Sequence, residues 1–179
     1  MTGKGVLMRR SRFGIDEAFL RRFSPRSFTD KPIKEEDLLA LFEAAGTAPS
    51  CWNEQPWRFV RGEKEDFHSI LSEKNAAWAD AAPVLLLICS TLTFSHNGKP
   101  NRWHAYDSGT AMGFLILEAL RRGIYAHPMA GYSKEKAVER FGLEGMETHA
   151  VLALGYTQQP HTMTVRLGIG EIVIDRRKT

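Results

Sequence analysis

Residues 48–57 read Ala-Pro-Ser-Cys-Trp-Asn-Glu-Gln-Pro-Trp. A proline stands near each end, and polar residues lie between, which predicts an irregular loop rather than a helix. The side chains of Ser50, Asn53 and Gln55 offer hydrogen-bond donors and acceptors without charge. These groups either bind a ligand or satisfy backbone groups within the loop. A short strand is expected to follow over residues 58–61.

Upstream of this loop, two helices are expected on either side of a second irregular segment. The segment is Arg22-Phe23-Ser24-Pro25-Arg26-Ser27-Phe28, in which Pro25 disfavours helix at the preceding Ser24. One helix is expected over residues 15–22. The other runs over 35–46, with acids in its first turn, where the helix dipole favours them, and apolar residues at helical spacing.

Downstream, apolar patterning predicts the remaining elements. The run Val84–Cys89 follows a proline and predicts a strand buried on both faces. A long helix, capped by Asp107 or Ser108 and reaching Arg122, is apolar nearly all round, so a partner subunit is expected to cover part of it. Other helices are expected over 64–72 and 133–141, the latter capped by Ser133, and other strands over 124–128, 150–156 and 169–174.

Helices and strands alternate without a strict βαβ repeat, which predicts an α+β fold, a sandwich of helices around a mostly antiparallel sheet. The chain of 179 residues is 43% hydrophobic and 25% charged, and we expect a single domain over residues 1–179. The longest apolar run is far short of the roughly 20 residues that span a bilayer. No signal-peptide pattern opens the sequence, so a soluble, cytoplasmic protein without membrane contact is expected.

Several function classes lack sequence support. The two cysteines have no CxxC spacing and the six histidines no ligand spacing, so neither a disulfide nor a metal site is expected. P-loop, Rossmann, GxSxG and HExxH motifs are absent. The net charge is +3, with arginines concentrated near both ends. No nucleic-acid-binding signature accompanies them, so no nucleic-acid partner is expected. Binding of a small anionic ligand is still a possible role for these arginines.

Together, the segments at 22–28 and 48–57 resemble the nitroreductase family. That family shows an R-R-S-x-R-x-F segment, a Pro-Ile step into a helix, and A-P-S-x-x-N-x-Q-P-W after it. The chain has the same order at similar spacing, with Pro32-Ile33 as the step. Ala82-Pro83, Asp107-x-Gly109 and Gly155-Tyr156 extend the similarity over most of the chain. The resemblance implies an intertwined homodimer with flavin mononucleotide (FMN) bound at the subunit interface.

The resemblance assigns the first segment to the flavin phosphate. The implied cofactor residues are Arg22, Ser24 and Arg26, with Phe23 between them. Two guanidinium groups and a hydroxyl can donate hydrogen bonds to the oxygens of a phosphate dianion. A late basic residue is implied as well. Arg166 is the best match for it, and Arg176 and Arg177 are the other candidates. The alternative for each of these arginines is that it is an ordinary solvent-exposed surface residue.

The second segment is implied to reach the flavin ring held mainly by the other subunit, through Pro49, Ser50, Asn53 and Gln55. Asn75 matches a position beside the reactive edge of the flavin, with an ordinary helix-ending role as its alternative. Trp78 stands where several relatives have a lysine near the ring. Pro128-Met129-Ala130-Gly131 resembles a segment whose backbone passes close to the ring, where a glycine permits the approach.

The implied function is an FMN-dependent oxidoreductase that takes hydride from NADH or NADPH and reduces a nitroaromatic, a quinone or a similar acceptor by a ping-pong mechanism. No catalytic side chain is expected, because the flavin carries the chemistry. An acid pair of His104 and Asp107 is disfavoured. Trp52 is expected to fill an interface, with stacking on a substrate as its alternative. The alternatives are a specialised reductase or dehalogenase on the same fold, and a non-catalytic flavin-binding regulatory module.

Overall fold

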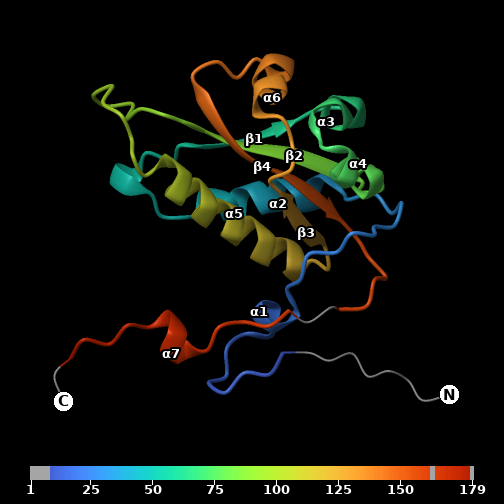
Figure 1. The fold of residues 1–179 in the computed structure, drawn as a ribbon, viewed down its shortest axis with the longest axis vertical. Coiled ribbons are helices and arrows are strands. Elements are labelled where there is room, and N and C mark those ends of the chain that lie inside the picture. Colours follow the sequence, from blue (N-terminus) through green and yellow to red (C-terminus); the bar gives the residue numbers. More distant parts are fainter. Residues whose placement is uncertain (1–8, 162–163, 178–179) are drawn as a thin grey trace.

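A computed structural model describes residues 9–161 and 164–177 of the chain. Its centre is a four-stranded sheet in the order β1-β2-β4-β3, in which every neighbouring pair is antiparallel (Figure 1). The strands are β1 (Trp57–Arg61), β2 (Val84–Thr91), β3 (Tyr125–Met129) and β4 (Met146–Gly155). The pairing of β2 with β4 shifts register between Ile88 and Cys89.

Helices cover both faces of the sheet. The helices of the described residues are α1 (Glu17–Arg21), α2 (Glu35–Gly46), α3 (Lys64–Ile70), α4 (Glu73–Ala79), α5 (His104–Arg121), α6 (Lys134–Phe141) and α7 (Ile169–Ile172), with a 3-10 helix η1 (Cys51–Asn53), and α2 to α6 are the ones that pack on the sheet. The core on one face is formed with α2 and α5, and the core on the other with α3, α4 and α6 (Figure 1). The predicted α+β sandwich with an antiparallel sheet is confirmed.

Strand β2 has no solvent-facing side along most of its length. Leu85, Leu87 and Cys89 enter the core shared with α3, α4 and α6, whereas Leu86 and Ile88 enter the core shared with α2 and α5. Alternate side chains of a strand point to opposite faces, so the apolar run confirms the predicted strand buried on both sides. Burial raises the pKa of the Cys89 thiol to about 11, as is typical of a cysteine that serves packing.

Helix ends follow local chemistry. Three acids open α2, and Leu38, Leu41 and Ala45 on its inner face are buried. The Ser133 side chain caps α6 by accepting a hydrogen bond from the Lys136 backbone N–H at 3.2 Å, as predicted. Gly142 then ends α6 with a left-handed φ of 61°.

Three expectations about elements are wrong. Residues 169–174 form no strand, because this segment lies away from the sheet and has no partner strand there (Figure 1). A single helical turn forms in its place, and the Glu171 carboxylate accepts a hydrogen bond from the Gly168 N–H at its start. Helix α5 begins at His104, so Asp107 lies inside it and is no cap. The helix expected over 64–72 ends at Ile70, and a separate α4 places Asn75 in a first turn rather than at a helix end.

Candidate functional site

Five predicted residues from two distant parts of the chain line one pocket. Its volume is about 440 Å³, and Arg22, Ser24 and Arg26 share it with Arg166. The Arg22 Nη1 donates to Ser24 Oγ at 3.3 Å, which orients both side chains on the same loop. Phe23 is the fifth predicted residue in the lining, and the other lining residues are His127, Gln159 and Thr164.

The pocket carries concentrated positive charge. Burial lowers the pKa of Arg22, and the neighbouring guanidinium groups of Arg9 and Arg166 lower it further. Burial and Arg166 likewise lower the pKa of Arg9. Within the described ranges, no carboxylate forms an ion pair with Arg9, Arg22, Arg26 or Arg166. Because arginine stays charged at neutral pH, the arrangement fits a dianion.

The fold holds the first segment against the end of β4. The Thr29 N–H donates to the Tyr156 carbonyl at 2.8 Å, and Thr157 Oγ1 donates to the Ser27 carbonyl at 2.6 Å. The Phe23 ring is buried and packs edge-on against Tyr125 at 5.1 Å between centroids. Phe23 therefore positions Arg22 and Ser24 mainly by packing.

The second segment adopts an unusual backbone. Trp52, Asn53 and Gln55 have positive φ values of 56°, 56° and 50°. Such conformations cost non-glycine residues about 1–3 kcal/mol each and cluster at functional sites. Ser50 Oγ accepts from the Gln55 N–H at 3.0 Å, and Gln55 Nε2 donates to the Asn53 carbonyl at 3.2 Å. The polar groups thus stabilise the loop, and the Asn53 side chain forms no hydrogen bond within the described residues.

Two carboxylates anchor this loop to its surroundings. Asp107, only 4% exposed, accepts a hydrogen bond from the Cys51 N–H at 3.0 Å. Glu54 accepts from the N–H of Ser95 at 3.0 Å. His104 instead contacts Ser90 Oγ at 2.8 Å through Nδ1, so His104 and Asp107 do not form an acid pair. Trp52 is 81% exposed, and no interface covers it in the single chain.

A third group joins α4 to the segment after β3. Asn75 Nδ2 donates to the Gly131 carbonyl at 3.0 Å, and the Ser72 N–H donates to the same oxygen at 3.0 Å. A Cβ at Gly131 would lie 2.7 Å from Asn75 Nδ2, so close approach explains this glycine. Met129 is buried in the core and Ala130 is exposed, while Pro128 pairs with Leu152 in the sheet.

Within one chain, the loop at 48–57 does not lie next to the basic pocket. His127 joins the basic pocket to β3, because its Nδ1 lies 2.8 Å from the Pro25 carbonyl. The loop at 48–57 lies near the start of α5, whereas α1 and the basic segment after it lie near the end of α5 (Figure 1). A helix of 18 residues is about 27 Å long. Ser50, Asn53 and Gln55 therefore lie far from Arg22 of the same chain.

Sequence reasoning overlooked some pocket residues and left others open. Of the three late arginines, only Arg166 lines the pocket; Arg177 pairs with Asp175, and Arg176 is exposed. Arg9 was visible only as one of several arginines near the N-terminus. His127 directly precedes a predicted segment, and no sequence pattern singles it out.

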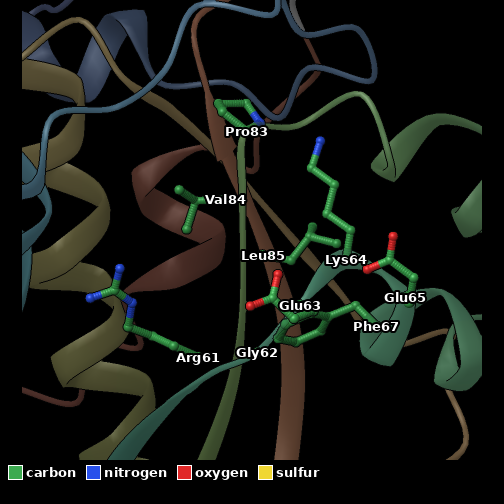
Figure 2. Close-up of a pocket in the computed structure, with 9 residues that line it drawn as sticks. All are labelled: Arg61, Gly62, Glu63, Lys64, Glu65, Phe67, Pro83, Val84 and Leu85. Carbon is green, nitrogen blue, oxygen red and sulfur yellow. The ribbon is translucent and has the colours of Figure 1, made fainter.

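A further pocket, of about 460 Å³, lies where β1, α3 and β2 meet (Figure 2). Both of its basic residues have partners: Arg61 pairs with Glu35 at 2.7 Å, and Lys64 Nζ donates to the Asp80 carbonyl at 2.9 Å. None of the sequence-predicted site residues lines it. The lining residues are Arg61, Gly62, Glu63, Lys64, Glu65, Phe67, Pro83, Val84 and Leu85.

Comparison with known proteins agrees with this arrangement. A model of the nitroreductase family matches residues 20–68 and 61–156. The chain belongs to the nitroreductase family. The predicted resemblance is therefore confirmed, and the match spans the basic segment, the loop at 48–57 and all four strands.

Individual relatives of this nitroreductase-family chain extend the comparison. An NADH dehydrogenase of Thermus thermophilus is 28% identical over 193 residues, covering 89% of this chain and 94% of that protein. An uncharacterized 15.4 kDa protein of Mycolicibacterium smegmatis is 37% identical over 87 residues, covering 48% of this chain and 57% of that protein. A crystal structure of an oxidoreductase containing FMN is 35% identical, with a TM-score of 0.86 and 96% of each chain covered.

The described residues lack two further features. No helix among them is long and apolar enough to cross a membrane. They also contain no group of three or more His, Cys, Asp or Glu side chains placed to hold a metal ion.

Proposed function

We propose that this chain binds FMN and passes hydride from NADH or NADPH through it to a nitroaromatic, a quinone or a similar acceptor. The observation that carries the proposal is the meeting of Arg22, Ser24 and Arg26 with Arg166 in one pocket. A phosphate monoester is the dianion that this cluster fits, because guanidinium forks and a hydroxyl match its oxygens. The names of the relatives support the same cofactors.

When bound, FMN supplies the hydride chemistry, and the protein supplies orientation and electrostatics. Arg22, Arg26 and Arg166 hold the phosphate end. The hydrogen bond from Asn75 to the Gly131 carbonyl ties α4 to residues 128–131, and these two parts would together hold the flavin ring. No side chain is required as a catalytic acid or base. The nicotinamide product leaves before the acceptor enters the same space, which makes the cycle ping-pong.

The active enzyme is a homodimer in this proposal. Exposed apolar side chains gather on both terminal segments, including Phe13 at 76%, Val165 at 97% and Leu167 at 64% exposed. Large exposed apolar surfaces mark interaction sites. Since the loop at 48–57 lies far from the basic pocket of its own chain, the loop of one protomer serves the flavin bound mainly by its partner.

Gly131→Ala tests the unit formed by α4 and residues 128–131. The added Cβ would lie 2.7 Å from Asn75 Nδ2 and 3.1 Å from Ser72 Oγ, so the Asn75–Gly131 hydrogen bond is lost. One such bond contributes about 0.5–1.5 kcal/mol. We expect the free energy of unfolding to fall by about 1 kcal/mol and FMN to bind up to tenfold more weakly, as measured by urea denaturation and flavin fluorescence.

Gly46→Ala is the matched control, because a Cβ there meets no atom within 4 Å. It is expected to leave FMN affinity unchanged and stability equal or slightly higher. Equal affinity for FMN in Gly131→Ala and Gly46→Ala would contradict the assignment of the Asn75–Gly131 unit to the ring.

Anaerobic half-reactions test the proposed function. NADH or NADPH is mixed with FMN-loaded protein, the nicotinamide product is removed by gel filtration, and menadione or a nitroaromatic is then added. The proposal expects flavin absorbance to be lost in the first step and restored in the second. Reoxidation by halogenated phenols but not by these acceptors would favour the specialised role. If neither NADH nor NADPH reduces the bound FMN, the result would favour the non-catalytic regulatory module.

A further inference from the structure

His127 has a fixed orientation in the basic pocket. Its Nδ1 lies 2.8 Å from the Pro25 carbonyl oxygen. A carbonyl only accepts hydrogen bonds, so Nδ1 carries a proton in both the neutral and the charged ring. The other nitrogen, Nε2, forms no hydrogen bond within the described residues. His127 lines the pocket together with Arg22 and Arg26, and the neutral ring offers that pocket a lone pair rather than a donor.

The surroundings of this ring favour its neutral form over its charged form. Burial lowers the pKa of His127 most, and Arg26 and Arg22 lower it further, against the opposing effect of the Pro25 hydrogen bond. On the neighbouring strand β4, the residue paired with His127 is the uncharged Ala153. From α4, the uncharged Trp78 ring packs on the His127 ring, 4.6 Å away between centroids. Arg166 is the remaining charged residue of the pocket, so the charged residues that line it with His127, among those the structure describes, are all positive.

A dianion in the pocket offsets most of this positive charge and places negative oxygen atoms beside the ring. The imidazolium form has N–H donors at both nitrogens, so Nδ1 keeps its bond to Pro25 while Nε2 becomes a donor toward the pocket. The Trp78 ring supports the charge, because an aromatic face attracts a cation. We propose that His127 is a proton-coupled ligand of the FMN phosphate, neutral in the free protein and protonated from solvent at Nε2 when the phosphate enters.

The inference rests on the proposed binding of FMN, and the experiment separates the two. Proton NMR follows the His127 Cε1–H signal against pH in the unaltered protein, alone, with FMN, and with riboflavin, which lacks the phosphate. His127→Gln identifies the signal. The inference expects the His127 pKa to lie below the ordinary value in the free protein, to rise by at least one unit with FMN and to stay low with riboflavin.

Affinity gives a second readout. At pH 6, His127→Gln is expected to bind FMN roughly tenfold more weakly than the unaltered protein. At pH 8.5 the two affinities should agree within about twofold, because His127 no longer takes up a proton at that pH. Titration of the phosphate itself cancels in this comparison. His96→Gln, on an exposed loop, is the matched control and should bind normally at both pH values.

Each outcome is decisive. FMN that binds with the His127 pKa unmoved or lowered overturns the inference and leaves the proposed function standing. FMN that fails to bind the unaltered protein overturns both. Thermal melting of His127→Gln shows whether that variant folds. If it does not, single substitutions of the five other histidines identify the His127 signal as the one that none of them removes, and the NMR titration then decides the question.

Discussion

Joint substitution of Arg22→Ala and Arg26→Ala weakens FMN binding by roughly 10²- to 10⁴-fold. Each arginine is assigned at least one charge-assisted hydrogen bond to the phosphate, and such a bond contributes about 1.5–3 kcal/mol. Both residues line the basic pocket, and neither forms an ion pair within the described residues. Fluorescence quenching of FMN on titration with protein measures the change.

Two comparisons isolate the phosphate contribution. Arg102→Ala with Arg121→Ala removes the same charge from exposed positions and should leave FMN affinity unchanged. Riboflavin has no phosphate, so its weak affinity should be nearly the same for the doubly substituted and unaltered proteins. Full flavin occupancy of the Arg22→Ala, Arg26→Ala protein after purification would contradict the phosphate assignment.

Leu86→Ala is expected to reduce the free energy of unfolding by about 2–5 kcal/mol, because it removes buried methyl groups and leaves a cavity. Leu86 is 0% exposed on the central strand β2 and packs in the core formed with α2 and α5. Urea denaturation monitored by circular dichroism measures the loss.

Leu39→Ala provides the matched control, since the same side chain on α2 is 56% exposed. A surface substitution of this kind usually changes stability by about 0.5 kcal/mol or less. Equal losses for the two variants would show that β2 does not lie at the centre of the folded core.

Local chemistry explains which parts of the fold were predictable. The apolar run at 84–89, the acids that open α2 and the Ser133 cap each act over a few residues, and each prediction is confirmed. The strand expected at 169–174 failed because a strand depends on a partner that the local pattern does not specify. Asp107 was mistaken for a helix cap because its actual partner, the Cys51 N–H, comes from a loop 56 residues away.

The candidate site was predictable to the extent that its residues form continuous segments. Arg22 to Arg26 and Ser50 to Gln55 are each recognisable alone, whereas the approach of Arg166 to Arg22 depends on how the C-terminal segment returns to the pocket. His127 enters the pocket only because β3 pairs with the end of β4, beside the loop that carries Pro25. No spacing rule connects positions 25 and 127.

The most direct test of the proposed flavin enzyme is the visible spectrum of natively purified protein before and after anaerobic addition of NADH or NADPH. We expect yellow protein that releases FMN on denaturation and loses its flavin absorbance with at least one of the two cofactors. Colourless protein that also fails to take up added FMN would contradict the account, because the pocket formed with Arg22, Arg26 and Arg166 would then not bind the cofactor assigned to it.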